Sequence, residues 1–227
     1  TVWTNPAGLS RLQQRQAVGV LHLIRPSIKF SDRASVAAAG QPLGDNGGDA
    51  GGLNAVPDLY LALPVSPAVS VGLGVSAPWG LVTEYEDSFI GRFQATRSSI
   101  RTINVNPGVG WKVLPSVALG LGLNYQRIDA EFNNWVNYSA ALLNAAAAQG
   151  VSPGTATFGA IAQSTPGLAA TASVKGQDGA FGWNAGVLWD LASQARLGVH
   201  YRSRIRYRID GDVRFTNPAL PAIASPA

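Results

Sequence analysis

The sequence predicts an all-β protein, an antiparallel β-barrel that crosses a membrane, and two observations support this. The first is a series of segments about ten residues long in which apolar residues alternate with small or polar ones. Successive side chains of a strand point to opposite faces, so each segment has one apolar and one small or polar face. The second is that no apolar run reaches the roughly 18 to 20 residues of a transmembrane helix, which leaves a closed barrel as the route through a bilayer.

The composition is compatible with a protein of the bacterial envelope. The 227 residues carry a formal net charge of +4, and they include 26 glycines, 14 prolines and no cysteine. The glycines and prolines predict turns and closely packed strands, and without cysteine there are no disulfides or thiolate metal sites. Because the chain begins without an export signal and ends without a terminal strand, we expect a processed chain or a fragment.

The first six predicted strands follow one another along the chain. In residues 71–76, valine and leucine alternate with glycine and serine. The second face is small or polar rather than charged, so we expect it to line a lumen while the apolar face contacts lipid. The same pattern, weak in the first two segments and clear in the others, predicts strands at residues 16–24, 56–63, 102–113, 117–126 and 181–189. Five aromatic residues of the predicted strands are expected at the membrane interface: Trp111, Tyr125, Trp183, Trp189 and Tyr201.

The seventh predicted strand, residues 196–209, has the most informative pattern. Arg202, Arg204, Arg206 and Arg208 alternate with tyrosines and isoleucines, so an extended strand here has one cationic and one apolar face. We expect all four arginines to point into the lumen.

The connections alternate between tight turns and long excursions. The long ones are residues 31–54, 81–97 and 138–176, whereas the turns between them span only a few residues. Bacterial outer-membrane barrels have short periplasmic turns and long extracellular loops, so the first strand is expected to run outward. Within the longest excursion, the alanine-rich residues 139–150 predict a short helix, with a low-complexity linker as the alternative.

Three short stretches resemble a known family. They are Thr-Asn-Pro-Ala-Gly-Leu from Thr4, the segment from Ser70 through Ala-Pro-Trp-Gly-Leu to Tyr85, and Thr-Ile-Asn-Val-Asn-Pro from Thr102. In order and spacing they resemble the FadL-type outer-membrane transporters of long-chain fatty acids and other hydrophobic compounds, the OMPP1/FadL/TodX family. The resemblance implies a 14-stranded barrel, of which about seven strands are present here.

The resemblance also implies an N-terminal hatch inside the barrel. Residues 1–15 are then the end of the hatch, and residues 16–227 are the N-terminal half of the transmembrane barrel. By motif match, the hatch ends at Asn5, Pro6 and Ala7.

In the family the third strand has an inward kink that opens a lateral gap in the wall. By motif match, the kink consists of Ala77, Pro78, Trp79 and Gly80. The residues themselves agree, because proline lacks the N–H that a strand ladder needs and glycine permits unusual backbone angles. An ordinary strand end is the alternative.

Two kinds of side chain are candidates for ligand binding. Apolar residues that point inward suit an acyl chain, whereas a water-filled porin would carry charge there; loop packing is the alternative. Inward arginines suit the carboxylate of a fatty acid, because guanidinium binds carboxylates bidentately; a solvated lumen with pairing to Asp210 or Asp212 is the alternative. The inward apolar candidates are Ile128, Ala130 and Phe132, and the arginine candidates are Arg202 and Arg204. Leu142 and Leu143, in the predicted loop helix, are expected to form an external capture groove.

These expectations point to passive transport of long-chain fatty acids or other hydrophobic molecules, with binding in the barrel and lateral release through the third strand. A general diffusion porin is the first alternative, and a surface enzyme built around His200 is the second. We expect no enzyme, because the catalytic and phosphate-binding motifs are missing, and no metal or other cofactor. The expected partners are a fatty acid or aromatic hydrocarbon, outer-membrane lipid and lipopolysaccharide, with no nucleic acid and a monomeric state.

Overall fold

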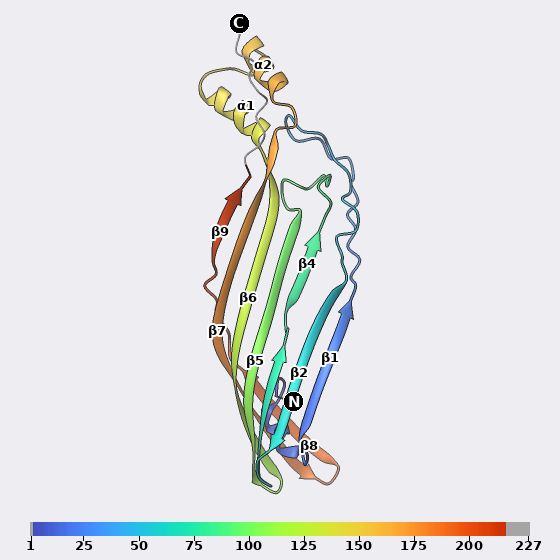
Figure 1. Ribbon diagram of the computed structural model, residues 1–227, viewed down its shortest axis with the longest axis vertical. Helices are drawn as coiled ribbons and strands as arrows, with labels where there is room; N and C mark the ends of the chain where they lie inside the picture. Colours follow the sequence, from blue (N-terminus) through green and yellow to red (C-terminus); the bar gives the residue numbers. More distant parts are fainter. Residues whose placement is uncertain (1, 217–227) are drawn as a thin grey trace.

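The computed structural model describes residues 2–216, whose strands form one curled antiparallel sheet, about half of a barrel wall (Figure 1). The tight turns lie at one end of the sheet, and the helices and long loops lie at the other (Figure 1). We call these the turn end and the loop end.

Nine strands occupy seven positions in the sheet. Their hydrogen-bonded order is β1-β2-β3-β5-β6-β7-β8; in addition β4 pairs with β5, and β9 pairs with β7. The elements are η1 (Pro6–Arg11), β1 (Gln16–Ile24), β2 (Asn54–Pro64), β3 (Val69–Ser76), β4 (Gly80–Glu84), β5 (Arg97–Leu114), β6 (Val117–Asn137), α1 (Tyr138–Ala148), α2 (Ala156–Ser164), β7 (Ala169–Ala192), β8 (Ala195–Arg202) and β9 (Asp210–Phe215). The predicted antiparallel barrel fold and its seven strand positions are confirmed.

The loop end differs in detail from the prediction. Helix α1 confirms the predicted helix, whereas α2 was not predicted, because glycine and threonine lower its helix propensity. Two predicted excursions are too long: β4 fills the start of residues 81–97, and β7 fills the end of residues 138–176. Pairing between β6 and β7 continues up to Asn137 and Ala169. Both strands therefore extend beyond the segments in which the sequence alternates apolar with small or polar residues. No helix in the described residues is long and apolar enough to cross a membrane.

Residue parity assigns the two faces of the sheet. Strands β5, β6 and β7 pair in a constant register over most of their length, so their even-numbered side chains share one face. The N-terminal segment, residues 2–11, packs against this face, which we call the inner face.

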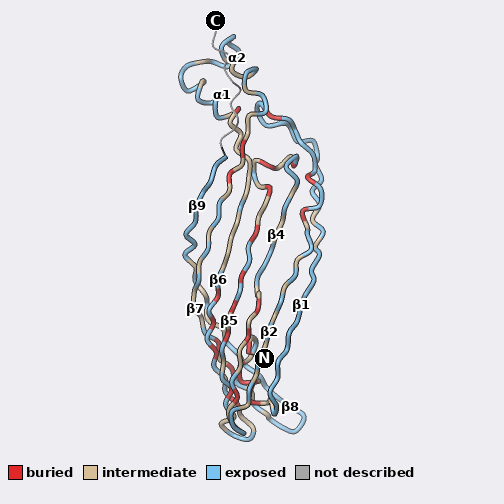
Figure 2. The backbone as a smooth tube through the Cα atoms, in the orientation of Figure 1, coloured by how far each residue is buried: buried red, intermediate tan, exposed pale blue. Residues whose placement is uncertain are grey.

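In the half of the wall near the turn end, the inner face is polar or glycine and the outer face is apolar. Four inner asparagines, Asn104, Asn106, Asn124 and Asn184, are at most 1% exposed. Figure 2 shows that buried residues gather in the central strands of this half. On the outer face Leu121 is 53% exposed. The predicted arrangement, with apolar residues toward lipid, is confirmed for this half of the wall.

Toward the loop end the polarity of the two faces is reversed. Even-numbered residues of β6 change from Asn124 and Gln126 to Ile128, Ala130 and Phe132, so the inner face becomes largely apolar. Asp178 of β7, opposite Ile128, is a charged residue on this face. The outer face becomes charged, with residues that include Arg97, Arg101, Arg127, Asp129, Glu131 and Lys175. The alternation is therefore continuous in these strands, but the two faces exchange their chemistry along it.

Two strand positions are broken, and each break contains one extra residue. From Ser76 to Gly80 the broken strand advances four residues, while β5 advances three, from Asn104 to Arg101. From Arg202 to Asp210 the second broken strand advances eight residues, while β7 advances seven, from Asn184 to Gln177. One inserted residue moves every following side chain to the opposite face.

The prediction of one strand through residues 196–209 is therefore wrong beyond Arg202. Ser203 is the extra residue: its N–H donates to the carbonyl of Trp183 (2.8 Å), and its hydroxyl accepts from the Trp183 N–H (2.8 Å). After it, Ile205 lies against the inner side of Gly182, and Ile209 against that of Gly176.

The arginines beyond Ser203 face outward. Arg204, Arg206 and Arg208 are exposed, and they alternate with the inward residues Ile205 and Ile209. The prediction that all four arginines line the lumen therefore holds for Arg202 alone. The alternating pattern continues without change through the inserted residue, so the pattern assigns the wrong face after it.

Candidate functional site: an apolar chamber above an N-terminal segment

The N-terminal segment lies on a track of inner glycines. A Cβ atom at Gly110 would lie 2.8 Å from the Ser10 nitrogen and 2.9 Å from Leu9 Cβ. A Cβ at Gly120 would overlap the backbone of Ala7, and one at Gly186 would overlap the Asn5 side chain. Only glycine allows the segment to approach the wall this closely.

The residues of the predicted hatch motif hold the segment in place. Asn5 Oδ1 accepts a hydrogen bond from the Ala7 N–H (3.0 Å) and so caps η1, whose first residue is Pro6. Asn5 Nδ2 donates to the carbonyls of Val187 (3.2 Å) and Val199 (3.3 Å), on neighbouring strands β7 and β8. One side chain thus orders the segment and attaches it to the wall. The role of Asn5, Pro6 and Ala7 as a movable hatch stays a prediction.

An asparagine cluster joins the segment to the three central strands. Asn184 Nδ2 donates to the Val2 carbonyl (3.0 Å), and Asn184 Oδ1 accepts from Asn106 Nδ2 (3.2 Å) and Asn124 Nδ2 (3.1 Å). Asn106 Nδ2 also donates to the carbonyl of Leu123 (2.5 Å). The register places that carbonyl opposite Pro107, which has no N–H to offer it, so the amide side chain satisfies the ladder there.

Arg202 also holds the segment. It donates to the carbonyl of Trp3 and to Asn124 Oδ1 (3.1 Å), and its guanidinium lies 3.3 Å from the centroid of the Trp3 ring. Arg202 therefore points inward, as expected of a candidate for the head-group site. Its partner in the structure, however, is the N-terminal segment.

Above the segment, apolar side chains of several strands share the inner face. Ile128, Ala130 and Phe132 lie there, at the positions expected of them, although their role in binding stays a prediction. Sequence reasoning missed the residues that join them, which are Leu81, Ile100, Val174, Ile205, Ile209, Val213 and Phe215. The missed residues in β4, β9 and the second break face inward only because the inserted residues reverse the direction of the side chains that follow them. We call this inner apolar surface the chamber.

The other predicted ligand residues lie elsewhere. Leu142 and Leu143 are on α1, which lies beyond the loop end of the wall, and Leu142 is exposed (Figure 1). Arg204 faces outward in the second break. The structure therefore separates Arg204 from the chamber, and an external capture groove formed by Leu142 and Leu143 stays a prediction.

The first break, residues 77–79, lies where the resemblance expects the kink. Thr102 bridges it: its N–H (3.0 Å) and hydroxyl (2.7 Å) donate to the carbonyl of Trp79, and the Trp79 N–H donates to its Oγ1 (3.0 Å). Gly80 is not in the break, because it pairs with Arg101 as the first residue of β4. A lateral opening through Ala77, Pro78 and Trp79 stays a prediction.

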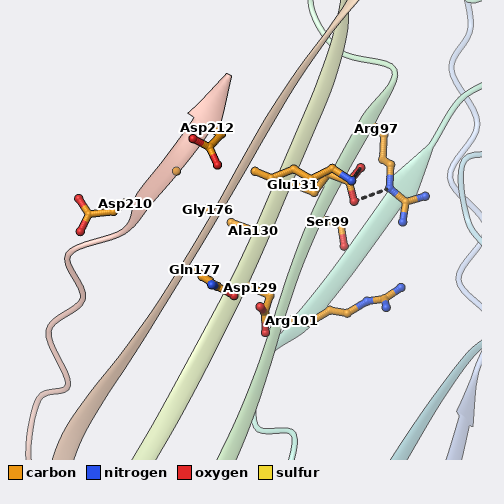
Figure 3. A pocket seen from close by; sticks show the side chains of 12 residues that line it. Arg97, Ser99, Arg101, Asp129, Ala130, Glu131, Gly176, Gln177, Asp210 and Asp212 are labelled. Atoms are coloured by element: carbon orange, nitrogen blue, oxygen red, sulfur yellow. Dashed lines mark ion pairs between the residues drawn. The ribbon is translucent and has the colours of Figure 1, made fainter. Parts of the chain in front are cut away.

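A charged hollow lies on the opposite, outer face of the wall (Figure 3). It has a volume of about 360 Å³ and lies across β5, β6, β7 and β9. Arg97 points toward Glu131, whose carboxylate lies 3.6 Å away and also pairs with Lys175 (3.2 Å). Because parity places these residues outside, the hollow is separate from the chamber. No group of three or more potential metal ligands occurs in residues 2–216.

Known proteins match most of the chain. A family model described as outer membrane protein transport protein (OMPP1/FadL/TodX) matches residues 1–224. The chain belongs to this family. Its relatives include a long-chain fatty acid transport protein of Escherichia coli O6:H1, 31% identical over 73% of this chain and 36% of the relative. A putative outer membrane protein of Neisseria meningitidis serogroup B is 29% identical over 99% of this chain and 48% of its own length.

Solved structures of OMPP1/FadL/TodX proteins share the fold. A FadL homologue of Pseudomonas aeruginosa matches with a TM-score of 0.66 at 22% identity, over 92% of this chain and 49% of that chain. The P. putida toluene transporter TodX matches with a TM-score of 0.61 at 17% identity, over 93% and 55%. The chain thus spans about half the length of these family members. As a member of this family, it is a β-barrel protein of the outer membrane.

Proposed function

We propose that the protein transports long-chain fatty acids or other hydrophobic molecules passively across the outer membrane. The ligand binds in the chamber and leaves sideways through residues 77–79 when the N-terminal segment shifts. One observation carries the proposal: an apolar inner surface at the loop end lies directly above a polar inner surface that the N-terminal segment fills. The loop end is the extracellular side if the usual barrel orientation applies.

The chamber supplies the affinity. Burial of an acyl chain contributes about 0.8 kcal/mol per methylene group, so apolar walls capture such a ligand without an energy source. Residues from five strand positions of the sheet contribute to this surface, Ile100, Phe132 and Ile205 among them. A fatty acid and an aromatic hydrocarbon both satisfy this requirement.

Arg202 links the ligand to the N-terminal segment. It lies between the asparagine cluster and the inward residues Ile205 and Ile209, while its guanidinium bonds the carbonyl of Trp3. A carboxylate binds guanidinium more strongly than a carbonyl does. An arriving fatty-acid head group therefore competes with Trp3 and loosens the segment. An aromatic hydrocarbon has no such group.

The exit is the first break. Pro78 leaves the ladder short of a donor, and within residues 2–216 Thr102 is the residue that bridges Trp79 to β5. A small shift of the segment therefore opens the wall at this point. The alternatives fit less well. A diffusion porin needs a water-filled lumen. An enzyme centred on His200 needs an acid or nucleophile bonded to it, whereas in the described part of the chain the His200 side chain makes no hydrogen bond.

A disulfide that locks the segment tests the proposal, because this chain contains no cysteine. Leu9→Cys with Gly110→Cys places two Cβ atoms about 2.9 Å apart, a separation that a small shift brings to bonding range. We expect oxidised full-length protein to stop taking up labelled oleate and toluene, and reductant to restore uptake. Each single cysteine variant is the control. Uptake at the parent rate in the oxidised double variant contradicts the proposal, and a large open conductance in planar bilayers supports the porin instead.

A further inference from the structure

Three outward arginines lie at the second break, within residues 203–209. Arg202 points inward and Gly211 points inward, with Ser203 as the inserted residue, so Arg204, Arg206 and Arg208 occupy consecutive outward positions. Their alternation with the inward residues Ile205 and Ile209 places all three guanidinium groups on the outside of the barrel.

These arginines lie at the upper edge of the lipid-facing surface. Below them are two aromatic pairs on the outer face, Tyr125 with Phe181 (5.0 Å between centroids) and Trp183 with Tyr201 (5.2 Å). Aromatic residues of this kind mark the level of lipid head groups. Above the aromatic pairs the outer face is charged, starting with Arg127 opposite Gly179. The break thus lies at head-group level.

In the part of the chain that the structure describes, some cations pair with carboxylates and others, such as Arg101 and Arg214, do not. Arg11, Arg97, Arg127, Lys175 and Arg196 each pair with a carboxylate. Within residues 2–216, no ion pair is made by the side chains of Arg204, Arg206 or Arg208. Three adjacent guanidinium groups without carboxylate partners form a surface for a multiply charged anion.

We propose that Arg204, Arg206 and Arg208 bind the phosphate groups of lipid A, the phosphorylated glycolipid that anchors lipopolysaccharide in the outer leaflet. Guanidinium forms bidentate bonds with phosphate, and basic clusters at the membrane surface bind anionic head groups. The apolar outer surface below, with Val187 and Val199, is continuous with the cluster and accepts the acyl chains of the same lipid. This site lies on the face opposite the chamber, so it does not depend on the proposed transport function.

The test compares lipid A binding by full-length variants in detergent, measured by native mass spectrometry. The variant is Arg204→Gln/Arg206→Gln/Arg208→Gln, and the matched control is Arg25→Gln/Lys29→Gln/Arg33→Gln, three exposed basic residues of the first long loop. We expect the affinity of the variant for lipid A to fall by roughly a hundredfold, since each arginine contributes about a factor of five. The control keeps its affinity, and lipid A without phosphates binds parent and variant alike. Equal lipid A binding by parent and variant overturns the proposal, as does an equal loss in the control.

Single variants keep the test valid if the triple variant does not fold. Each of Arg204→Gln, Arg206→Gln and Arg208→Gln should lower the affinity for lipid A by about fivefold. Arg196→Gln, at the turn end and paired with Asp190, should leave it unchanged. Unchanged affinity in all three single variants overturns the proposal.

Discussion

The turn-end and loop-end halves of this wall are built on the same strands with opposite polarity. In β6, the inner face carries Asn124 near the turn end and Phe132 near the loop end, while the outer face changes from Leu121 to Glu131. The turn-end half is thus organised for lipid outside and a polar filling inside. The loop-end half is organised like a water-soluble shell around an apolar space. One continuous sheet thus combines a lipid-facing half with a half whose inner face is the apolar chamber.

The largest effect is expected from a side chain on the glycine track of the turn-end half. Gly120→Leu places atoms where the backbone of Ala7 lies, so the N-terminal segment cannot dock and the lumen opens. We expect the full-length variant to conduct ions in planar bilayers at least tenfold more than the parent. Gly19→Leu is the matched control, because a Cβ at Gly19 meets nothing within 4 Å. Parent-like conductance in Gly120→Leu would mean that the segment does not close the lumen.

A second prediction tests the polarity of the outer face. Leu121→Arg puts a cation in the apolar half of the wall, and we expect it to destabilise the full-length barrel by about 2–4 kcal/mol in vesicles. Gln177→Arg lies on the same face in the charged half, opposite Asp210, and should cost about 0–1 kcal/mol. Guanidinium unfolding in lipid vesicles measures both. Similar costs at the two positions would contradict the reversal of polarity.

The sequence predicts the fold well and the faces only in part. Alternation locates β1 at its observed bounds, Gln16–Ile24, and identifies all seven strand positions. It cannot detect an inserted residue within an unbroken alternation, and for this reason Arg204 was assigned to the lumen when it faces outward. Pro78 within the first break and Gly80 directly after it indicate this break in the sequence itself. The second break has no such signal, because Ser203 fits an alternating pattern as well as any strand residue does.

The site is predictable to a similar extent. Ile128, Ala130 and Phe132 follow from their parity on an unbroken strand. Leu81 and Val213 do not, because they face inward only after an insertion in their own strands. Contacts of Arg202 with Trp3 join residues far apart in sequence, and no local pattern encodes them.

A third prediction concerns the inner face of the loop-end half. Ile128→Asn adds a polar group without charge to the chamber, and we expect uptake of labelled oleate to fall roughly tenfold, since the loss of one apolar side chain weakens capture. Ile128→Leu keeps the apolar surface and serves as the control. The amounts of folded protein in the outer membrane are matched by blotting. Normal uptake by Ile128→Asn would show that the ligand does not bind to this surface during transport.

The smallest effect concerns acid, which should loosen loops at the loop end before it affects the asparagine contacts of the turn end. Asp49, in the loop between β1 and β2, accepts hydrogen bonds from the Ser27 hydroxyl (2.7 Å) and from the N–H groups of Ile28 (2.8 Å) and Gly51 (3.0 Å). These bonds, that of Ser27 foremost, lower the pKa of Asp49 from 3.8 to about 2. Because the pKa is lowered by folding, the carboxylate stabilises the loop above pH 3.8 and loses this effect as the pH falls toward 2.

Hydrogen exchange measures this difference between the two ends. After correction for intrinsic rates, amides of residues 27–51 should exchange faster at pH 2 than at pH 5, whereas the amide of Ala7, held by the non-titrating Asn5, should show no such change. Asp49→Asn should exchange equally fast at both pH values in the loop, because it has no carboxylate to protonate. A loop that keeps its protection at pH 2 in the parent would show that the Asp49 contacts do not hold it.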